Sequence, residues 1–145
     1  MHKVNRSALV PFSAEQMFRL VDDVESYPEF LPWCSDAHIE SRDGDIVEAT
    51  LELHKGGLRK RFTTRNKLHF PDAINLDLLG GPFRHLQGGW QFQQLGKDGS
   101  KVSLVLAFEF ESIVLDMLLG GFFEETCNKL VDAFTQRAAV VYRDD

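Results

Sequence analysis

The sequence predicts an α+β fold in which a curved antiparallel sheet of six to seven strands wraps around a long C-terminal helix, with two short helices after the first strand. Runs with the alternation of strands follow one another from about residue 34 to residue 110, separated by turn residues. Residues 113–143 then place apolar side chains at steps of three and four, which form one stripe along a helix. Consecutive hairpins make a meander that curls, so we expect the stripe to lie in the concave face of the sheet.

The length and charge of the chain limit the classes of protein to consider. Its 145 residues have the length of one domain, 1–145, with a single core. The net charge of −6 argues against a protein that binds nucleic acid over its whole surface, and no DNA partner is expected. Because the N-terminal residues lack the pattern of a secretory signal and no run of about 18 apolar residues occurs, we expect a soluble, cytoplasmic chain.

The N-terminal third predicts a strand followed by two short helices. Residues 3–10 alternate as a strand does, and Ser13 with Gln16 has the spacing of a capping box at the start of a helix that runs to about Val24. Residues 27–34 then hold three aromatic residues and two prolines, which position large rings rigidly. Two interpretations stay open: a connector that plugs one end of the sheet, or a rigid aromatic rim at the mouth of a pocket.

Six further strands follow in series, each bounded by residues that favour turns. They are expected at residues 35–42, 47–54, 58–69, 74–78, 86–95 and 102–110, with a loop at Gly80, Gly81 and Pro82 that also carries Phe83, Arg84 and His85.

Apolar residues on the predicted inner face point to a cavity. A strongly curved sheet and a straight helix leave volume between them, and an apolar lining makes that volume a site for a hydrophobic ligand. The 12 Phe against 2 Tyr supply many ring faces that carry no polar group. The residues expected at this cavity and its rim are Phe30, Leu31, Trp33, Leu51, Leu53, Phe62, Leu76, Phe83, Trp90, Phe92, Leu106, Phe108, Leu115, Leu119 and Phe123.

The predicted C-terminal helix has one weak point, at Gly120 and Gly121. Its apolar stripe is expected at Leu115, Leu119, Phe123, Cys127, Leu130, Phe134, Ala138 and Val141. Each glycine costs about 1 kcal/mol relative to alanine inside a helix. One interpretation is a break before a long helix that begins at about Phe122; the other is a hinge that lets residues 113–119 swing as a lid or gives a ligand access to the backbone.

No pattern in the chain indicates catalysis. A nucleophile with a base, or two acids in a cleft, is not evident, and Cys34 and Cys127 are expected to be buried thiols. The five histidines lack the spacing of metal ligands. We therefore expect no enzymatic activity, no metal and no required cofactor; a lyase or cyclase stays a third possibility that would need polar groups inside the cavity.

One segment is strongly basic. Residues 54–71 contain six of the 16 basic residues and no acid. Five of them, Lys55, Arg59, Arg61, Arg65 and Lys67, are predicted to form a basic surface. This surface is either a solvated strand face or a patch for ribosomal RNA or anionic lipid headgroups.

Together these elements resemble the START-like, helix-grip superfamily over the whole chain. Within it, four motifs are similar to the coenzyme Q-binding protein family, whose bacterial members are often labelled ribosome-association toxin RatA or polyketide cyclase/dehydrase-like. They are Tyr27-Pro-Glu-Phe-Leu-Pro-Trp-Cys34, Gly81-Pro-Phe83, Leu86 with Trp90 and Phe92, and Leu130-Val-Asp-Ala-Phe-Thr-Gln-Arg-Ala138 ending near Tyr142. The sequence departs from the family pattern at Gly120-Gly121-Phe122-Phe123, where the pocket entrance is expected to differ.

The resemblance implies a non-enzymatic protein that binds the polyprenyl tail of ubiquinone, or another polyprenyl lipid, beneath the terminal helix. Such a protein would support respiratory electron transport or quinone biosynthesis and delivery, with transient contact at the inner membrane surface. The alternative that it implies is a toxin that binds the large ribosomal subunit and blocks formation of the 70S ribosome.

Overall fold

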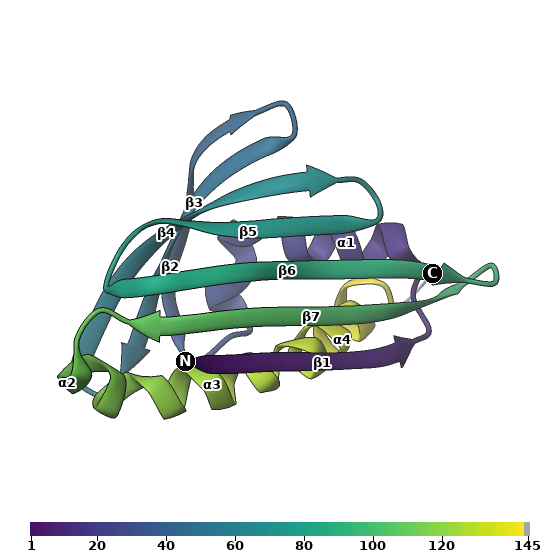
Figure 1. Cartoon of the computed structure of the whole chain (residues 1–145). Helices are drawn as coiled ribbons and strands as arrows, with labels where there is room; N and C mark the ends of the chain where they lie inside the picture. The colour runs from purple at the N-terminus through teal and green to yellow at the C-terminus, as the bar shows by residue number, and fades with distance from the viewer. Residues whose placement is uncertain (144–145) are drawn as a thin grey trace.

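The computed structural model describes residues 1–143 and consists of one sheet with helices across its concave face (Figure 1). The sheet has seven antiparallel strands in the order β1-β7-β6-β5-β4-β3-β2. The strands are β1 (His2–Val10), β2 (Cys34–Asp43), β3 (Ile46–Lys55), β4 (Leu58–His69), β5 (Ala73–Gly80), β6 (Phe83–Leu95) and β7 (Gly99–Phe110). β2 to β7 form a meander, and β1 joins it at β7 in a continuous register from His2 opposite Phe108 to Val10 opposite Ser100.

Two groups of helices cover the inner face. Between β1 and β2 lie α1 (Ala14–Asp22) and the 3₁₀ helix η1 (Val24–Glu29). After β7 come α2 (Ile113–Leu115), the π-helical segment η2 (Asp116–Gly120), α3 (Gly121–Asn128) and α4 (Leu130–Val141). Figure 1 shows the sheet curling around this last group, which confirms the predicted α+β fold.

The predicted capping box fixes the start of α1. The Gln16 amide donates to the Ser13 hydroxyl at 3.1 Å, and the Ser13 amide donates to the Gln16 side chain at 2.9 Å. The helix buries Met17, Phe18, Leu20 and Val21 against the core. This satisfies two amides at the helix start and turns an apolar face to the sheet.

β6 and β7 each begin three residues earlier than the sequence predicts. Phe83 was expected in a loop, but it starts β6 and pairs with Phe110 of β7. Its ring is buried and stacks on the Phe110 ring, with 4.4 Å between the centroids. Burial of this ring therefore extends the strand back to the residue after Pro82, so that Arg84 and His85 also lie in β6.

The terminal helix is not broken at Gly120 and Gly121, so both sequence interpretations of these glycines need correction. Both residues have helical backbone angles, and η2 runs directly into α3. Gly120 is required for another reason: a Cβ atom there would lie 2.5 Å from Nε2 of His2. The glycine lets the helix approach β1 closely. The space beside its backbone, which the sequence suggested for a ligand, is filled by the His2 side chain of the same chain.

The distortion in this helix lies at Lys129. Its amide donates to the Thr126 carbonyl at 3.1 Å, three residues back, where a regular α-helix would use the fourth. The irregular turn changes which side chains face the core: Val131 is buried, whereas the predicted Val141 is 47% exposed. Tyr142 packs in its place, because its hydroxyl donates to the Gln16 carbonyl of α1 at 3.1 Å.

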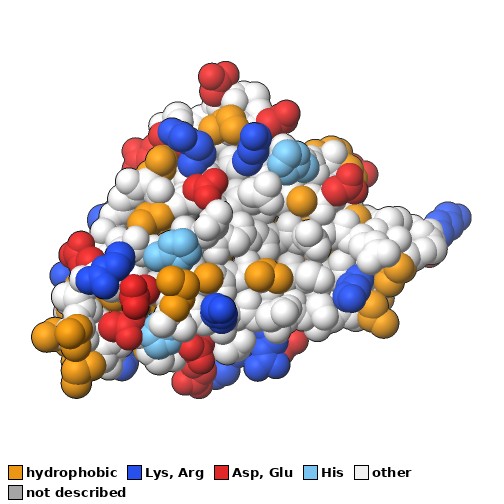
Figure 2. All heavy atoms as spheres, viewed as in Figure 1, with side chains coloured by type: hydrophobic (Ala, Val, Ile, Leu, Met, Phe, Trp, Pro, Cys, Tyr) orange, Lys and Arg blue, Asp and Glu red, His pale blue; other side chains and the backbone are white. Residues whose placement is uncertain are grey.

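The start of the C-terminal helical segment forms an exposed apolar tip, which we define as Ile113, Val114, Met117 and Leu118. These side chains are exposed, and apolar side chains gather over α2 at the lower left of Figure 2. Because Leu119 is buried while this tip points outward, residues 113–119 do not form a lid over the sheet.

His2 ties η2 and α3 to the edge strand. Its Nε2 lies 3.0 Å from Oδ2 of Asp116 and its Nδ1 lies 2.9 Å from Oε1 of Glu124. Although burial alone would lower the pKa of His2, the hydrogen bonds and charges of these two carboxylates raise it above 6.5. The hydrogen bond to His2 in turn holds the pKa of Asp116 below its usual value.

We expect His2→Phe to destabilise the fold in a pH-dependent way. Phenylalanine keeps the ring stacked on Phe108, 4.8 Å between centroids, but loses the charge. Because the folded pKa of His2 is raised, its stabilisation, about 1 kcal/mol, is fully present below pH 6.5 and is lost as the pH rises through the folded value. Thermal unfolding of the wild type and of His2→Phe at pH 5.5 and 8.5 measures this loss of stability. An equal loss at both pH values would contradict this account.

In the described part of the chain, no helix is long and apolar enough to cross a membrane.

Candidate functional site

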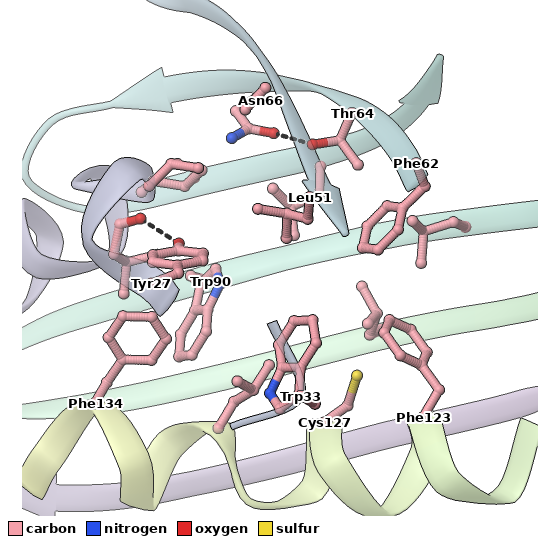
Figure 3. A pocket seen from close by; sticks show the side chains of 18 residues that line it. Tyr27, Trp33, Leu51, Phe62, Thr64, Asn66, Trp90, Phe123, Cys127 and Phe134 are labelled. Carbon is pink, nitrogen blue, oxygen red and sulfur yellow. Dashed lines mark hydrogen bonds between the residues drawn. The ribbon is translucent and has the colours of Figure 1, made fainter. Parts of the chain in front are cut away.

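An apolar cavity of about 80 Å³ lies between the sheet and the helices. Figure 3 shows its side chains converging from the sheet, from η1 and from the C-terminal helices. Its lining consists of Val21, Val24, Tyr27, Trp33, Ala49, Leu51, Phe62, Thr64, Asn66, Ile74, Leu76, Leu86, Trp90, Leu106, Phe123, Cys127, Leu130 and Phe134. Both tryptophans of the chain belong to this wall.

Aromatic rings hold the two ends of the cavity wall in place. At one end Phe134 packs edge-on against Trp90 and Tyr27, with 5.3 Å between centroids in each pair. At the other end Phe123 packs edge-on against Phe62 and Trp33, at 5.9 and 6.1 Å. Such edge-to-face contacts fix the rings in orientation, so the cavity has a defined shape.

The structure divides the predicted ligand-binding residues into three groups. The cavity is lined by Trp33, Leu51, Phe62, Leu76, Trp90, Leu106 and Phe123. An outer groove is lined by Phe30, Leu31 and again Trp33. The other predicted residues, Leu53, Phe83, Phe92, Phe108, Leu115 and Leu119, line neither.

These last six residues were predicted to line the cavity or its rim, and that prediction is wrong. Their side chains pack against neighbouring elements instead. Phe92 packs against Phe18 of α1, 5.7 Å between centroids, beyond the end of the cavity. Phe108 packs edge-on against Phe123 at 4.9 Å and stacks on His2. Alternation along a strand shows which residues face inward, but it does not show where along the strand a helix leaves space.

The prediction also missed residues that the structure brings to the cavity. They are Val21, Val24, Tyr27, Ala49, Thr64, Asn66, Ile74, Leu86, Cys127, Leu130 and Phe134. Cys127, Leu130 and Phe134 already belonged to the apolar stripe predicted for the C-terminal helix, so they could have been included. Thr64 and Asn66 share the inner face of β4 with Phe62, and their polarity on an apolar face was the available signal.

Thr64 and Asn66 make the cavity partly polar. The Thr64 hydroxyl donates to Oδ1 of Asn66 at 2.7 Å, and the two residues are 8% and 7% exposed. Figure 3 shows the oxygen of Asn66 turned toward Thr64 and its nitrogen on the other side. No residue in the described chain accepts a hydrogen bond from this nitrogen, and since no fully buried side-chain nitrogen or oxygen there lacks a partner, the nitrogen keeps some accessible surface.

Tyr27 contributes a ring but no free hydroxyl. Its hydroxyl donates to the Val21 carbonyl of α1, a bond that Figure 3 draws beside the cavity. Burial, together with the charge of Asp22, raises the pKa of Tyr27 far above its ordinary value. This side chain therefore braces η1 against α1 and is not available to exchange protons near neutral pH.

Burial also makes the two cysteines unreactive. Burial raises the pKa of Cys34 to about 11, and the pKa of Cys127, whose side chain lines the cavity, is raised further by the same cause. Both are free thiols and both are buried, as predicted. Because the thiolate is the nucleophilic form, neither sulfur supplies a nucleophile at neutral pH.

A larger groove of about 850 Å³ lies outside the cavity. Phe30, Pro32, Lys55, Phe122 and Lys129 are among its lining residues. Trp33 and Leu130 line both spaces, so these two side chains form the wall between groove and cavity. The segment of residues 27–34 therefore combines the two roles that the sequence left open. Tyr27 packs inside the cavity, and residues 30–33 form the rim of the outer groove.

The wall between the two spaces lies at an irregular point of the helix. Leu130 begins α4 directly after the distortion at Lys129, and Trp33 follows Pro32. The cavity alone is smaller than the roughly 300–1,000 Å³ of ordinary ligand sites. A ligand longer than a few carbon atoms would therefore need both spaces, with the wall displaced.

The basic surface on β4 is largely neutralised. Arg61 lies 3.0 Å from Asp36 and 3.2 Å from Glu52, and Arg65 lies 3.2 Å from Glu48. A hydrogen bond from Ser35, acting against burial, holds the pKa of Glu52 below its ordinary value, and the arginines add to this. Figure 2 shows acidic and basic side chains interspersed over the face that it presents.

Only part of the predicted basic surface keeps an unbalanced charge. Arg59 approaches Glu52 at 3.4 Å, and Lys55 donates to the Leu118 carbonyl at 3.0 Å while lying over the Phe122 ring. Within residues 1–143, Lys67 and the neighbouring Lys60 make no ion pair. The segment looked uniformly basic in sequence because its acidic partners come from β2 and β3.

Comparison with known proteins agrees with this architecture. Residues 10–135 match the family model described as polyketide cyclase/dehydrase and lipid transport. The chain is 46% identical over 142 residues to the ribosome association toxin RatA of Vibrio cholerae, covering 98% of this chain and 99% of that protein. It is 31% identical over 144 residues to the mitochondrial coenzyme Q-binding protein COQ10 homolog B of Xenopus laevis, covering 95% of this chain and 58% of that protein.

A solved structure shows the same fold. A START superfamily protein of Mycobacterium smegmatis superimposes with a TM-score of 0.82 at 23% identity, over 97% of this chain and 99% of that one. The chain therefore belongs to the polyketide cyclase/dehydrase and lipid transport family, together with the RatA proteins, and has the START-like helix-grip fold.

Proposed function

We propose that this protein binds an apolar molecule in the cavity beneath its C-terminal helices and carries it, and that this molecule is a polyprenyl lipid such as ubiquinone. The observation that supports this best is the cavity itself, which is walled by aliphatic side chains and aromatic rings and shares Trp33 and Leu130 with the larger groove. The lipid transport family and the coenzyme Q-binding name of one relative favour a lipid ligand. Quinone delivery in respiration is the role that fits such a carrier.

The ligand would occupy the cavity and continue into the groove. The groove provides apolar contacts from Phe30, Leu31 and Phe122 and opens to solvent beside Lys55 and Lys129. Movement of the Trp33 ring would join the two spaces, because this ring separates them and, within residues 1–143, makes a single aromatic contact, with Phe123. A polyprenyl chain is narrow and flexible, which suits a route of this shape.

We propose that no chemical step takes place in the cavity. Its polar side chains, Thr64, Asn66 and Tyr27, are hydrogen-bonded to one another or to the backbone, and its cysteine is held as a thiol by burial. Among residues 1–143 no group of three or more His, Cys, Asp or Glu side chains is placed to hold a metal ion. The polar groups that a lyase or cyclase would need are present as a neutral pair, without an acid or base.

Contact with the inner membrane surface stays a prediction, and the exposed apolar tip is the part of the molecule that would make it. The tip lies next to the groove, because Lys55 in the groove wall donates to Leu118 of the tip. A water-insoluble ligand transferred there would travel a short distance along apolar surface.

Native mass spectrometry of protein purified from its own host tests the carrier function. We expect a bound lipid whose mass matches a polyprenyl quinone. Delipidated protein should then bind ubiquinone with two isoprene units and quench the emission of Trp33 and Trp90, the tryptophans of the cavity wall. Protein that purifies without lipid and does not bind the short quinone would exclude this function.

A second candidate, supported by the names of the most similar relatives, is association with the large ribosomal subunit. Relatives named ribosome association toxin are 43–46% identical over 96–98% of this chain. All three arginines of β4 lie beside acids, so Lys67 is the cation best placed to meet RNA phosphates on the outer face, whereas Lys60 lies on the inner face with Phe62. The two functions use different parts of the molecule and are compatible.

If the ribosome is a partner, Lys60→Glu/Lys67→Glu should weaken cosedimentation with large ribosomal subunits. Because the two lysines lie on opposite faces of β4 and one face meets the RNA, the slope of log affinity against log salt should become shallower by about 1. The matched control is Lys97→Glu/Lys101→Glu, which makes the same charge change in the β6–β7 turn and at the start of β7. Equal binding by both double variants would show that β4 does not contact the ribosome, while lipid binding should be unaffected in either case.

A further inference from the structure

We propose that Asn66 recognises a hydrogen-bond acceptor on the ligand, so that the cavity takes an apolar molecule with a carbonyl or similar oxygen, and takes that end first. This inference rests on the proposed carrier function and adds the chemistry and orientation of the ligand. It concerns a neutral amide in an otherwise apolar wall, which a site for a plain hydrocarbon would not need.

The position of the amide supports the inference. Asn66 lies on the inner face of β4, opposite Leu76 of β5 and Val47 of β3, and more than nine-tenths of it is buried. Its side chain lines the cavity. An apolar residue at this position would pack equally well with these neighbours, so the amide is unexplained by packing alone.

The Thr64 hydroxyl fixes which end of the amide is available. Thr64 has a donor that binds Oδ1 of Asn66 at 2.7 Å, so the amide oxygen is occupied and the nitrogen remains. Within the described chain no acceptor faces this nitrogen. A nitrogen donor in apolar surroundings gains most from a ligand that brings an acceptor, because it forms a hydrogen bond in a site of low dielectric.

The geometry also gives the direction in which the ligand lies. Figure 3 shows Thr64 and Asn66 on the side of the cavity away from Trp33 and Cys127. Trp33 separates the cavity from the groove, so Asn66 lies at the inner end of the route. An oxygen that reaches Asn66 must therefore be carried by the leading end of the ligand, with the apolar remainder extending toward the groove.

The cavity wall also carries the indole N–H groups of Trp33 and Trp90; Trp33 forms the wall to the groove, so the donor that competes inside is that of Trp90. In residues 1–143 it too has no hydrogen-bond acceptor, and Trp90 is 4% exposed. Trp90 lies on β6, two strands from Asn66, and its ring is held by stacking on Phe92 and by the edge of Phe134. Because the ring is needed for packing whatever its nitrogen does, the two donors can be separated by experiment.

The test compares two probes of the same shape, geranylacetone and the hydrocarbon in which a methylene group replaces its ketone oxygen. Dissociation constants come from equilibrium dialysis with wild-type protein, Asn66→Leu, Thr64→Val/Asn66→Leu and Trp90→Phe. The double variant replaces both members of the polar pair by apolar groups, which protects against misfolding caused by an unpaired Thr64 hydroxyl.

The measured quantity is the dissociation constant of the ketone divided by that of the hydrocarbon. We expect this ratio to rise by about five- to tenfold in both Asn66 variants, which is the contribution of one neutral hydrogen bond. In Trp90→Phe the ratio should stay as in the wild type. Using the ratio cancels the different solubilities of the probes.

Two results would overturn the inference. If both probes bind but the ratio is unchanged in the Asn66 variants, or changes only in Trp90→Phe, Asn66 is not the recognition group and the carrier function still stands. If neither probe binds the wild type, the carrier function fails and this inference fails with it.

Discussion

Replacing Phe123 by alanine is expected to reduce the free energy of unfolding by about 3–5 kcal/mol, a large part of the stability of a domain of this size. Phe123 is 3% exposed and lies at the junction of the sheet with α3. Its ring meets Trp33, Phe62, Phe83, Phe108 and Phe110, with centroids 4.9–6.2 Å apart. Truncation would leave a void that these rings cannot fill without leaving their own contacts.

The neighbouring phenylalanine provides the matched control. Phe122 is half-buried, lines the outer groove and lies under the Lys55 ammonium at 5.4 Å. Phe122→Ala should cost about 1 kcal/mol or less, because solvent replaces the lost contacts. Chemical denaturation of both variants measures the difference; similar losses would mean that Phe123 is not central to the core.

Replacing Ala49 by leucine is expected to abolish ligand binding while the fold is kept. Ala49 is 2% exposed and lines the cavity from β3, where it lies opposite Thr64 of β4. Leucine adds three carbon atoms to a space of about 80 Å³. We expect the affinity for ubiquinone with two isoprene units to fall about a hundredfold, or about 2.8 kcal/mol, with stability changed by about 1–2 kcal/mol at most.

Ala8→Leu is the control for the cavity-filling change. Ala8 is half-buried on β1, and it does not line the cavity. Tryptophan fluorescence titration of both variants with the short quinone gives the affinities, and thermal unfolding shows that each is folded. If Ala49→Leu binds the quinone as tightly as Ala8→Leu does, the ligand site is elsewhere.

The two predictions together distinguish the parts of the core that hold the fold from those that hold the ligand. Phe123 belongs to both, whereas Ala49 borders empty space on one side. Cavity-filling substitutions often stabilise a protein at the expense of function, because natural ligand sites are underpacked. A more stable Ala49→Leu variant without ligand binding would therefore be a further sign that the space serves a ligand.

The sequence by itself determined the order of the elements and most of their inward faces. Alternation along residues 58–69 and the capping box at Ser13 are local patterns, and both are set by backbone geometry within one element. The family motifs in residues 27–34 and 130–138 also pointed to the fold and to the family that includes RatA, which comparison confirmed.

Only the tertiary structure decided which inward-facing residues border empty space. Phe92 and Phe108 have the same alternation as Trp90 and Leu106, but α1 covers the first and α3 with His2 covers the second. Likewise, the basic run of β4 meets its acids on β2 and β3, and Gly120 meets His2 from the other end of the chain. Such contacts depend on the distance between elements that are remote in sequence, which no local periodicity contains.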